Sequence, residues 1–187
     1  LSIDELGIFL VALEQAYASG LIDIRYHHFI KLTLLLGTRK SELATLKWDC
    51  YNQAKQTILL TDTKSGDDLL IKLPTQAIIL FEELATQRIN QYVFYGMKND
   101  QHLSIRTLLT YFNKVTDLAK ITELTIHDLR RTFSSRLSGL KYRLELIEKA
   151  TNHRIQGTAK HYQHDDMLEE RCEMLQGWAD YLDGIIK

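Results

Sequence analysis

The sequence predicts a mostly α-helical α+β domain with one small antiparallel β-sheet. Apolar residues recur at helical spacing over most of the chain, and only the stretch around residues 56–73 changes to strand-like runs. A single proline, Pro74, interrupts the 187 residues. A chain of this length has the size of one domain with a sizeable core.

Capping residues and apolar spacing define the first helices. Residues 2–5, Ser-Ile-Asp-Glu, have the pattern of a capping box, which predicts a helix over about 3–18. Apolar spacing predicts a second helix over 22–36. We expect Ser41 to cap a short third helix that runs to Leu46.

The middle of the chain predicts a β-hairpin followed by more helices. Residues 56–61 and 69–73 are β-branched or leucine-rich runs on either side of a polar turn, and Pro74 closes the hairpin. Helical spacing then predicts helices over about 76–90, 104–119, 127–139, 143–151, 156–163 and 166–184. The chain has no internal repeat or linker, so residues 1–187 are predicted to form a single domain.

The last predicted helix, 166–184, is amphipathic. Its apolar face comprises Leu168, Cys172, Leu175, Trp178 and Leu182, and acidic residues occupy the opposite face. Two interpretations stay open. The helix either packs on its own core or docks on a neighbouring subunit, since a chain-terminal amphipathic helix is easily exchanged between protomers.

Composition is that of a soluble globular protein. Hydrophobic residues make up 45% and charged residues 25%, and no apolar run is long enough to cross a membrane. Cys50 and Cys172 stand outside any CxxC pair, which is typical of reduced thiols in a cytoplasmic protein. Because the chain begins with Leu1 instead of Met, we expect it to be a piece of a longer protein.

Charge is distributed unevenly along the chain. The formal net charge of −1 by itself argues against a nucleic-acid partner. From residue 165 onward, however, seven acids face two bases, which leaves 21 bases and 17 acids before that point. A mildly basic body with an acidic tail permits DNA binding without demonstrating it.

Four short segments carry candidate catalytic side chains, and each is weak alone. Residues 36–43, Leu-Gly-Thr-Arg-Lys-Ser-Glu-Leu, place Arg39 at a helix start, where a guanidinium and backbone N–H groups suit a phosphate. Taken alone, this motif is better explained by an exposed structural arginine. Lys64 lies in the predicted hairpin turn, where a lysine is usually just solvated.

The other two segments add histidines and a tyrosine. His127 and Arg130 are three positions apart and share a helix face, and a neighbouring guanidinium disfavours the charged imidazole. Residues 151–153, Thr-Asn-His, are followed nine residues later by Tyr162, which polar residues flank. Most tyrosines are packing residues, so Tyr162 alone would indicate little.

The order and spacing of these segments resemble the catalytic domain of the tyrosine recombinase (phage integrase) family from Leu1 to about Leu182. As an ordered set the six residues are highly specific, namely Arg39, Lys64, His127, Arg130, His153 and Tyr162. Residues 152–153, Asn-His, stand where most of the family has Gly-His. Together with residues 168–171 and 178–182 they look like the satellite-prophage and genomic-island integrases.

The resemblance implies site-specific DNA recombination, the integration or excision of a prophage or genomic island. It makes Tyr162 the nucleophile that forms a 3′-phosphotyrosyl link and frees a 5′-hydroxyl. Arg39 and Arg130 would stabilise the charge that develops on the non-bridging oxygens. His127 would be the base for the tyrosine proton, with His153 bonding a phosphate oxygen or assisting.

The resemblance also implies roles for Lys64 and Glu42 and a reaction without cofactors. Lys64 would be the acid for the departing 5′-oxygen, and Glu42 would either orient Arg39 or serve only as a helix-start carboxylate. No ATP, other cofactor or metal is implied, because the covalent intermediate conserves the phosphodiester energy. A metal site at His161 and His164 is a rival interpretation, but no HExxH motif accompanies them.

The implied partners are double-stranded attachment-site DNA, further copies in a homotetramer joined through the C-terminal helix, an excisionase and DNA-bending host factors. We expect a cytoplasmic, nucleoid-associated protein without a membrane span. We expect this chain to lack the family's N-terminal arm and core-binding domain, so tight or sequence-specific binding by this chain alone is not expected. A type IB topoisomerase and a non-catalytic DNA-binding protein that retains the fold are the alternatives.

Overall fold

Residues 1–61, 66–97, 100–152 and 167–186 are described by the computed structural model of this chain. They form the mostly helical fold with a small antiparallel sheet that the sequence predicts. The helices are α1 (Ile3–Ala18), α2 (Ile24–Leu36), α3 (Lys40–Ala44), the 3-10 turn η1 (Trp48–Cys50), α4 (Thr75–Ala85), α5 (Ile105–Ala119), α6 (Ile126–Gly139), α7 (Leu144–Ala150) and α8 (Leu168–Ile186). The strands β1 (Tyr51–Asn52), β2 (Thr57–Leu60) and β3 (Leu69–Lys72) pair antiparallel in that order.

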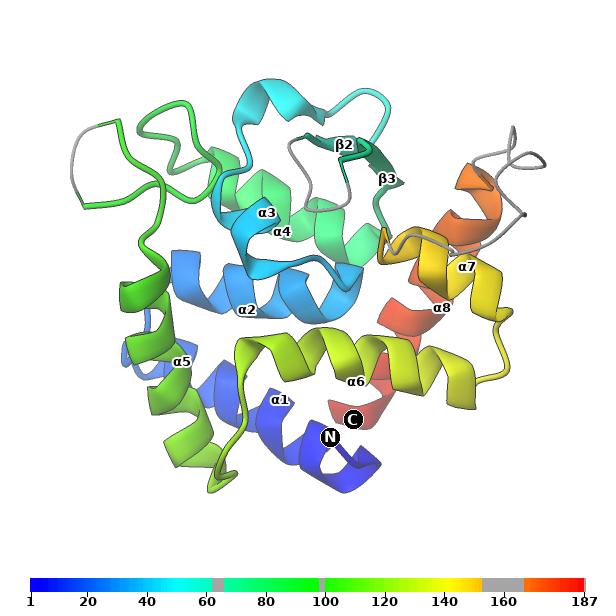
Figure 1. Cartoon of the computed structure of the whole chain (residues 1–187). Coiled ribbons are helices and arrows are strands. Elements are labelled where there is room, and N and C mark those ends of the chain that lie inside the picture. Colours follow the sequence, from blue (N-terminus) through cyan, green and yellow to red (C-terminus); the bar gives the residue numbers. More distant parts are fainter. Residues whose placement is uncertain (62–65, 98–99, 153–166, 187) are drawn as a thin grey trace.

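Helix α2 lies at the centre of the fold. It contacts α1, α3, α4, α5, α6 and α8, and most of its residues, polar ones included, are buried. Its second half, residues 32–36, is apolar except for Thr33, as expected of a helix that is surrounded on most sides, while its first half buries Arg25, His27 and His28. Figure 1 shows α6 running beside α2, with α1 on the far side of this pair from the sheet.

Two predicted helix starts differ from the structure. The second helix begins at Ile24, because the Asp23 carboxylate accepts a hydrogen bond of 2.9 Å from the Arg25 N–H and caps it. The prediction that Ser41 caps the third helix is wrong. Arg39 is the N-cap of α3, and the Glu42 carboxylate satisfies its backbone N–H at 3.1 Å.

The segment between α4 and α5 also departs from the prediction. Helix α4 ends at Ala85 instead of reaching residue 90, and the chain beyond it forms isolated β-bridges, Lys47 to Tyr92 and Tyr95 to His102. Val93 is buried there, and its N–H donates to Leu46 O at 2.9 Å. The burial of this segment comes from pairing with a distant part of the chain, which no local periodicity reveals.

Helix α8 packs within its own chain, against β3, α1, α2, α4 and α7. Trp178 is fully buried, and its indole N–H donates to Leu34 O at 2.9 Å. The predicted apolar face is partly wrong, because Cys172 is only half-buried while Arg171 and Met174 are buried. Exchange of the helix between subunits remains a prediction.

The remaining expectations concern other parts of the chain. The helix predicted over 156–163 lies outside the described residues. Among the described helices, none combines the length and apolar character that crossing a membrane requires.

Candidate active site

The candidate site is centred on the junction between α2 and α3. Gly37 ends α2 with a φ of 62°, in the left-handed region that favours glycine, and its N–H donates to Thr33 O at 3.0 Å. A Cβ atom at this position would overlap the ring of Phe133 from α6. The turn therefore requires glycine both for its backbone conformation and for the close approach of α6.

Arg39 leaves this junction with its guanidinium held at two points. Its Nη1 donates to Glu42 Oε1 at 2.7 Å, and its Nη2 donates to the carbonyl of Asn152 at 3.3 Å. Glu42 is buried, and a buried carboxylate needs such a partner. Its two oxygens hold both the backbone and the side chain of Arg39, which favours the orienting role over a purely local capping role.

Arg130 reaches the same junction from α6. Thr125 begins this helix, and its N–H donates to Asp128 Oδ2 at 3.0 Å, as in a capping box. Arg130 is only 4% exposed. Its Nη1 donates to Gly37 O at 2.7 Å and its Nη2 donates to Thr151 O, so one guanidinium joins the end of α2 to the end of α7.

Arg39 and Arg130 form a cationic pair on two consecutive carbonyls, those of Asn152 and Thr151 respectively. We call these two residues the arginine pair. Burial, followed by the charge of Arg39, lowers the pKa of Arg130 to about 10, against the opposing effects of Glu42 and Glu148. Arg130 therefore stays charged near neutral pH, and the surplus positive charge at the junction suits an anion such as a phosphate.

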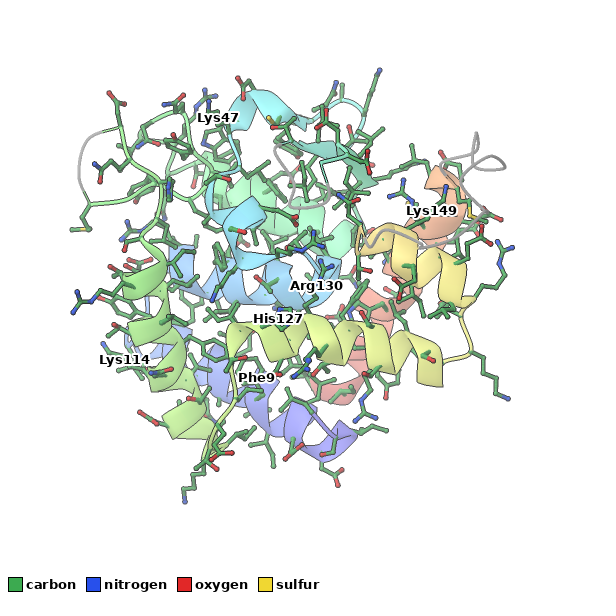
Figure 2. The ribbon with its side chains drawn as sticks, in the orientation of Figure 1. Phe9, Lys47, Lys114, His127, Arg130 and Lys149 are labelled. Carbon is green, nitrogen blue, oxygen red and sulfur yellow. The ribbon has the colours of Figure 1, made fainter. Side chains whose placement is uncertain are left out.

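His127 lies on the exposed side of the first turn of α6, three residues before Arg130. Figure 2 labels His127 and Arg130 along α6, near the α2–α3 junction. Desolvation, and then the charges of Arg130 and Arg131, lower the pKa of the His127 imidazole. The neutral form that a proton acceptor needs is thus favoured, in the direction expected from the sequence.

The structure brings four of the predicted site residues together, namely Arg39, Glu42, His127 and Arg130. Lys64, His153 and Tyr162 lie outside the described residues, as do His161 and His164 of the rival metal interpretation. Asn152 is the last described residue before His153, and its side-chain Nδ2 donates to the backbone carbonyl of Asp67 at 3.0 Å. This hydrogen bond joins the end of α7 to the loop between β2 and β3.

Sequence reasoning missed the backbone acceptors of the site. The carbonyls of Gly37, Thr151 and Asn152 hold the arginine pair, but every residue has a carbonyl and no sequence pattern marks these three. Thr151, which supplies one of these carbonyls, is fully buried, and its hydroxyl donates to Ile147 O at 2.8 Å.

Known proteins resemble this chain in both sequence and fold. A model of the phage integrase family matches residues 9–169. The prophage integrase IntZ of Escherichia coli (strain K12) is 30% identical over 98% of this chain, which spans only 45% of that relative. The chain thus covers less than half of this curated relative's length.

Two solved structures illustrate the shared fold. The integrase of mycobacterium phage Brujita superposes with a TM-score of 0.72 at 16% identity, covering 97% of this chain and 62% of that one. The XerH site-specific recombinase bound to its difH substrate gives a TM-score of 0.71 at 24% identity, covering 91% of this chain and 51% of that one.

Proposed function

Because this chain belongs to the phage integrase family, we propose that it carries out the DNA cleavage and rejoining of site-specific recombination. The observation that carries the proposal is the arginine pair, held on consecutive carbonyls at the end of α7. The two guanidiniums have surplus positive charge, because Glu42 pairs with Arg39 alone, and this charge suits the two non-bridging oxygens of a DNA phosphodiester.

The reaction is a pair of transesterifications. The Tyr162 hydroxyl oxygen attacks the phosphorus and gives its proton to His127, while the bond from phosphorus to the 5′-oxygen breaks. Lys64 donates a proton to that oxygen, so a 3′-phosphotyrosyl link and a free 5′-hydroxyl form. A 5′-hydroxyl from the partner strand then attacks the link and releases Tyr162, and the number of phosphodiester bonds is conserved.

The described residues supply the electrostatics of this reaction. The pentacoordinate transition state carries more negative charge than the phosphodiester, so donors fixed beforehand stabilise it preferentially. Arg130 is fixed by two carbonyls and Arg39 by Glu42 and a third carbonyl, so neither has to reorganise when the charge develops. His127 is poised as the base because its surroundings favour the neutral ring.

The proposed substrate is double-stranded DNA that carries attachment sites. Similar recombinase folds have been solved with DNA, among them XerH on difH and a lambda integrase dimer on a COC′ core site. Assembly into a homotetramer on DNA through α8, and control by an excisionase and DNA-bending host factors, belong to the same proposal. So does association with the nucleoid during recombination.

Covalent capture on nicked DNA tests this proposal. The protein in its full length is incubated with a nicked duplex from the ends of the genetic element that encodes it, and adducts are separated on a denaturing gel. We expect an adduct with the wild type and none with Tyr162→Phe. Arg39→Ala should reduce the cleavage rate by roughly 100- to 1000-fold while the protein stays folded.

Arg88→Ala is the matched control, because Arg88 is exposed and stacks near the Trp48 ring, away from the arginine pair. An adduct that survives Tyr162→Phe would refute the nucleophile, and full activity in Arg39→Ala would refute the role of the arginine pair. Relaxation of supercoiled plasmid without any joining of sites would favour the topoisomerase alternative. A wild type that never forms an adduct would favour a DNA-binding protein without catalysis.

A further inference from the structure

We propose that Lys40, the first residue of α3, binds a DNA phosphate next to the one that the arginine pair holds. The inference deepens the proposed function and rests on it, because it concerns the DNA strand that would be cleaved. It assigns Lys40 to binding that strand and gives it no part in proton transfer.

Arg39 and Lys40 are consecutive residues whose charged groups have different surroundings. The Arg39 guanidinium is turned into the junction, where it donates to Glu42 Oε1 at 2.7 Å and to Asn152 O at 3.3 Å. Lys40 is exposed. Because the Cα atoms of consecutive residues are only about 3.8 Å apart, the chain presents one cation inside the junction and a second one to solvent directly beside it.

Lys40 lies near the exposed imidazole of His127, although the two residues belong to different helices. Its charge is among the causes that lower the pKa of His127, after desolvation and the charges of Arg130 and Arg131 and against the charge of Asp128. His127 precedes Arg130 by three positions on α6. The Lys40 ammonium therefore borders the arginine pair on its solvent side.

No acid among the described residues pairs with Lys40. Glu42 pairs with Arg39, and Asp128 pairs with Arg131 at 3.3 Å. Arg131 is the other exposed cation on this face, but a neighbouring carboxylate offsets its charge. The charge of Lys40 has no such offset, so Lys40 is the cation of this face that a phosphate would gain most from meeting.

A DNA strand has to place further phosphates against this surface. Each strand carries one negative charge about every 3.4 Å along the helix axis. A strand with one phosphate on the arginine pair therefore brings the next phosphates against the surface around the pair. An ammonium on a flexible stem suits a phosphate there as a point charge, and such a contact fixes the register of the strand.

The salt dependence of DNA binding measures this contact. Each phosphate that a protein neutralises contributes about −0.9 to the slope of log affinity against log salt concentration. The full-length wild type and Lys40→Gln are titrated into the nicked duplex between roughly 50 and 200 mM salt. Over this range the affinity of the wild type should fall about 3- to 4-fold more than that of Lys40→Gln. Lys40→Arg keeps the charge and should keep the wild-type slope.

Lys120→Gln is the matched control. Lys120 is exposed at the C-terminal end of α5, and Figure 1 shows this end of the helix away from the α2–α3 junction. The substitution removes the same charge from the protein as Lys40→Gln does, so an effect of net charge alone would appear in both variants. We expect Lys120→Gln to have the wild-type slope.

A second measurement identifies the phosphate. In a series of duplexes, one phosphate at a time around the cleavage position is replaced by an uncharged methylphosphonate. Neutralising the phosphate that Lys40 holds should weaken binding by the wild type and by Lys120→Gln. It should have no effect on Lys40→Gln, because that variant has already lost the contact. Neutralising the other phosphates should weaken binding by all three proteins to the same degree.

The outcomes separate the Lys40 contact from the proposed function. A wild-type slope in Lys40→Gln, or an equal change of slope in Lys120→Gln, would overturn the contact. So would a series in which no phosphate beside the cleaved one becomes silent in Lys40→Gln. If the wild type showed the expected slope and Lys40→Gln the silent phosphate, but the duplex were never cleaved, the proposed function would fail while the Lys40 contact would stand.

Discussion

At the scale of single residues, two adjacent histidines form a hydrogen-bonded chain away from the arginine pair. The Nδ1 atoms of His27 and His28 are 2.9 Å apart, and their Nε2 atoms face Glu14 at 3.1 Å and Glu83 at 2.7 Å. Only one proton can lie between the two Nδ1 atoms. One ring therefore donates from its Nδ1 atom and the other ring accepts at its Nδ1 atom.

These histidines give the fold a predictable dependence on pH. Burial, despite the bond to Glu83, lowers the pKa of His28 from 6.5 to about 4, and the hydrogen bond from His27 lowers the pKa of Glu14 from 4.5 to about 2. Between pH 6.5 and 4 the unfolded chain binds a proton at His28 that the folded chain does not bind. The free energy of unfolding therefore falls as the pH falls through this window, by up to about 1.4 kcal/mol per pH unit. Glu14 extends the loss from about pH 4.5 toward pH 2.

Urea titrations at several pH values between 7 and 4 measure this slope. His28→Gln should flatten it relative to the wild type, and His102→Gln, at a half-buried histidine in the segment between α4 and α5, is the matched control. Acids and bases that do not contact His28 contribute equally to all three proteins, so the difference reports His28 together with its partners His27 and Glu83. An undiminished slope in His28→Gln would contradict the assignment.

The sequence predicts the charged side chains of the site better than the backbone groups that hold them by hydrogen bonds. Arg39, His127 and Arg130 could be singled out because a phosphate needs cations and proton transfer needs an imidazole. Their partners could not, because carbonyls such as those of Gly37 and Thr151 are chosen by tertiary structure alone.

At the scale of elements, the helices that were predicted correctly are those whose caps and apolar spacing lie within the helix itself. The α1 helix agrees with its capping box, and α5 and α6 agree with their apolar spacing, because caps and spacing act within one helix. Strand β1 was missed. It has only two residues, too few to show alternation, and its pairing with β2 is a property of the sheet.

The junction of α2 and α3 is the element boundary on which the site depends most. Gly37→Ala should lower the free energy of unfolding by about 2–4 kcal/mol, since it adds both a left-handed alanine and an overlap with Phe133. Gly20→Ala is the matched control. Gly20 also has a positive φ, 73°, but a Cβ there meets no atom within 4 Å, so the cost should be only about 1 kcal/mol.

Urea unfolding of both alanine variants measures the two costs. Their difference reports the close approach of Phe133 to the junction, because the backbone strain is common to both positions. Equal costs would show that the Phe133 ring moves aside easily. The α2–α3 turn would then be a less rigid support for Arg39 than the geometry indicates.

At the scale of the whole molecule, α8 connects elements from the first half of the chain with α7 from the second half. Its buried residues, Met174, Leu175, Trp178, Ala179 and Leu182, pack against elements from both halves of the chain. Burying a large apolar side chain stabilises a protein by roughly 1.5–3 kcal/mol. Exchange of α8 between subunits would replace these contacts with the same contacts in a neighbour, so it adds little energy of its own and needs DNA or another interface to drive it.

We therefore expect the isolated chain to keep α8 in its own core and to remain a monomer of 21.7 kDa in solution. The midpoint of urea unfolding distinguishes a monomer from an assembly in which α8 is exchanged between subunits. Mass action stabilises the exchanged assembly as protein concentration rises and has no effect on a monomer. The midpoint should be independent of concentration, and sedimentation should give the monomer mass. Trp178→Ala should lower the free energy of unfolding by about 3–5 kcal/mol, again without any dependence on concentration. A midpoint that rises with concentration in the wild type would show that α8 docks on a second copy even without DNA.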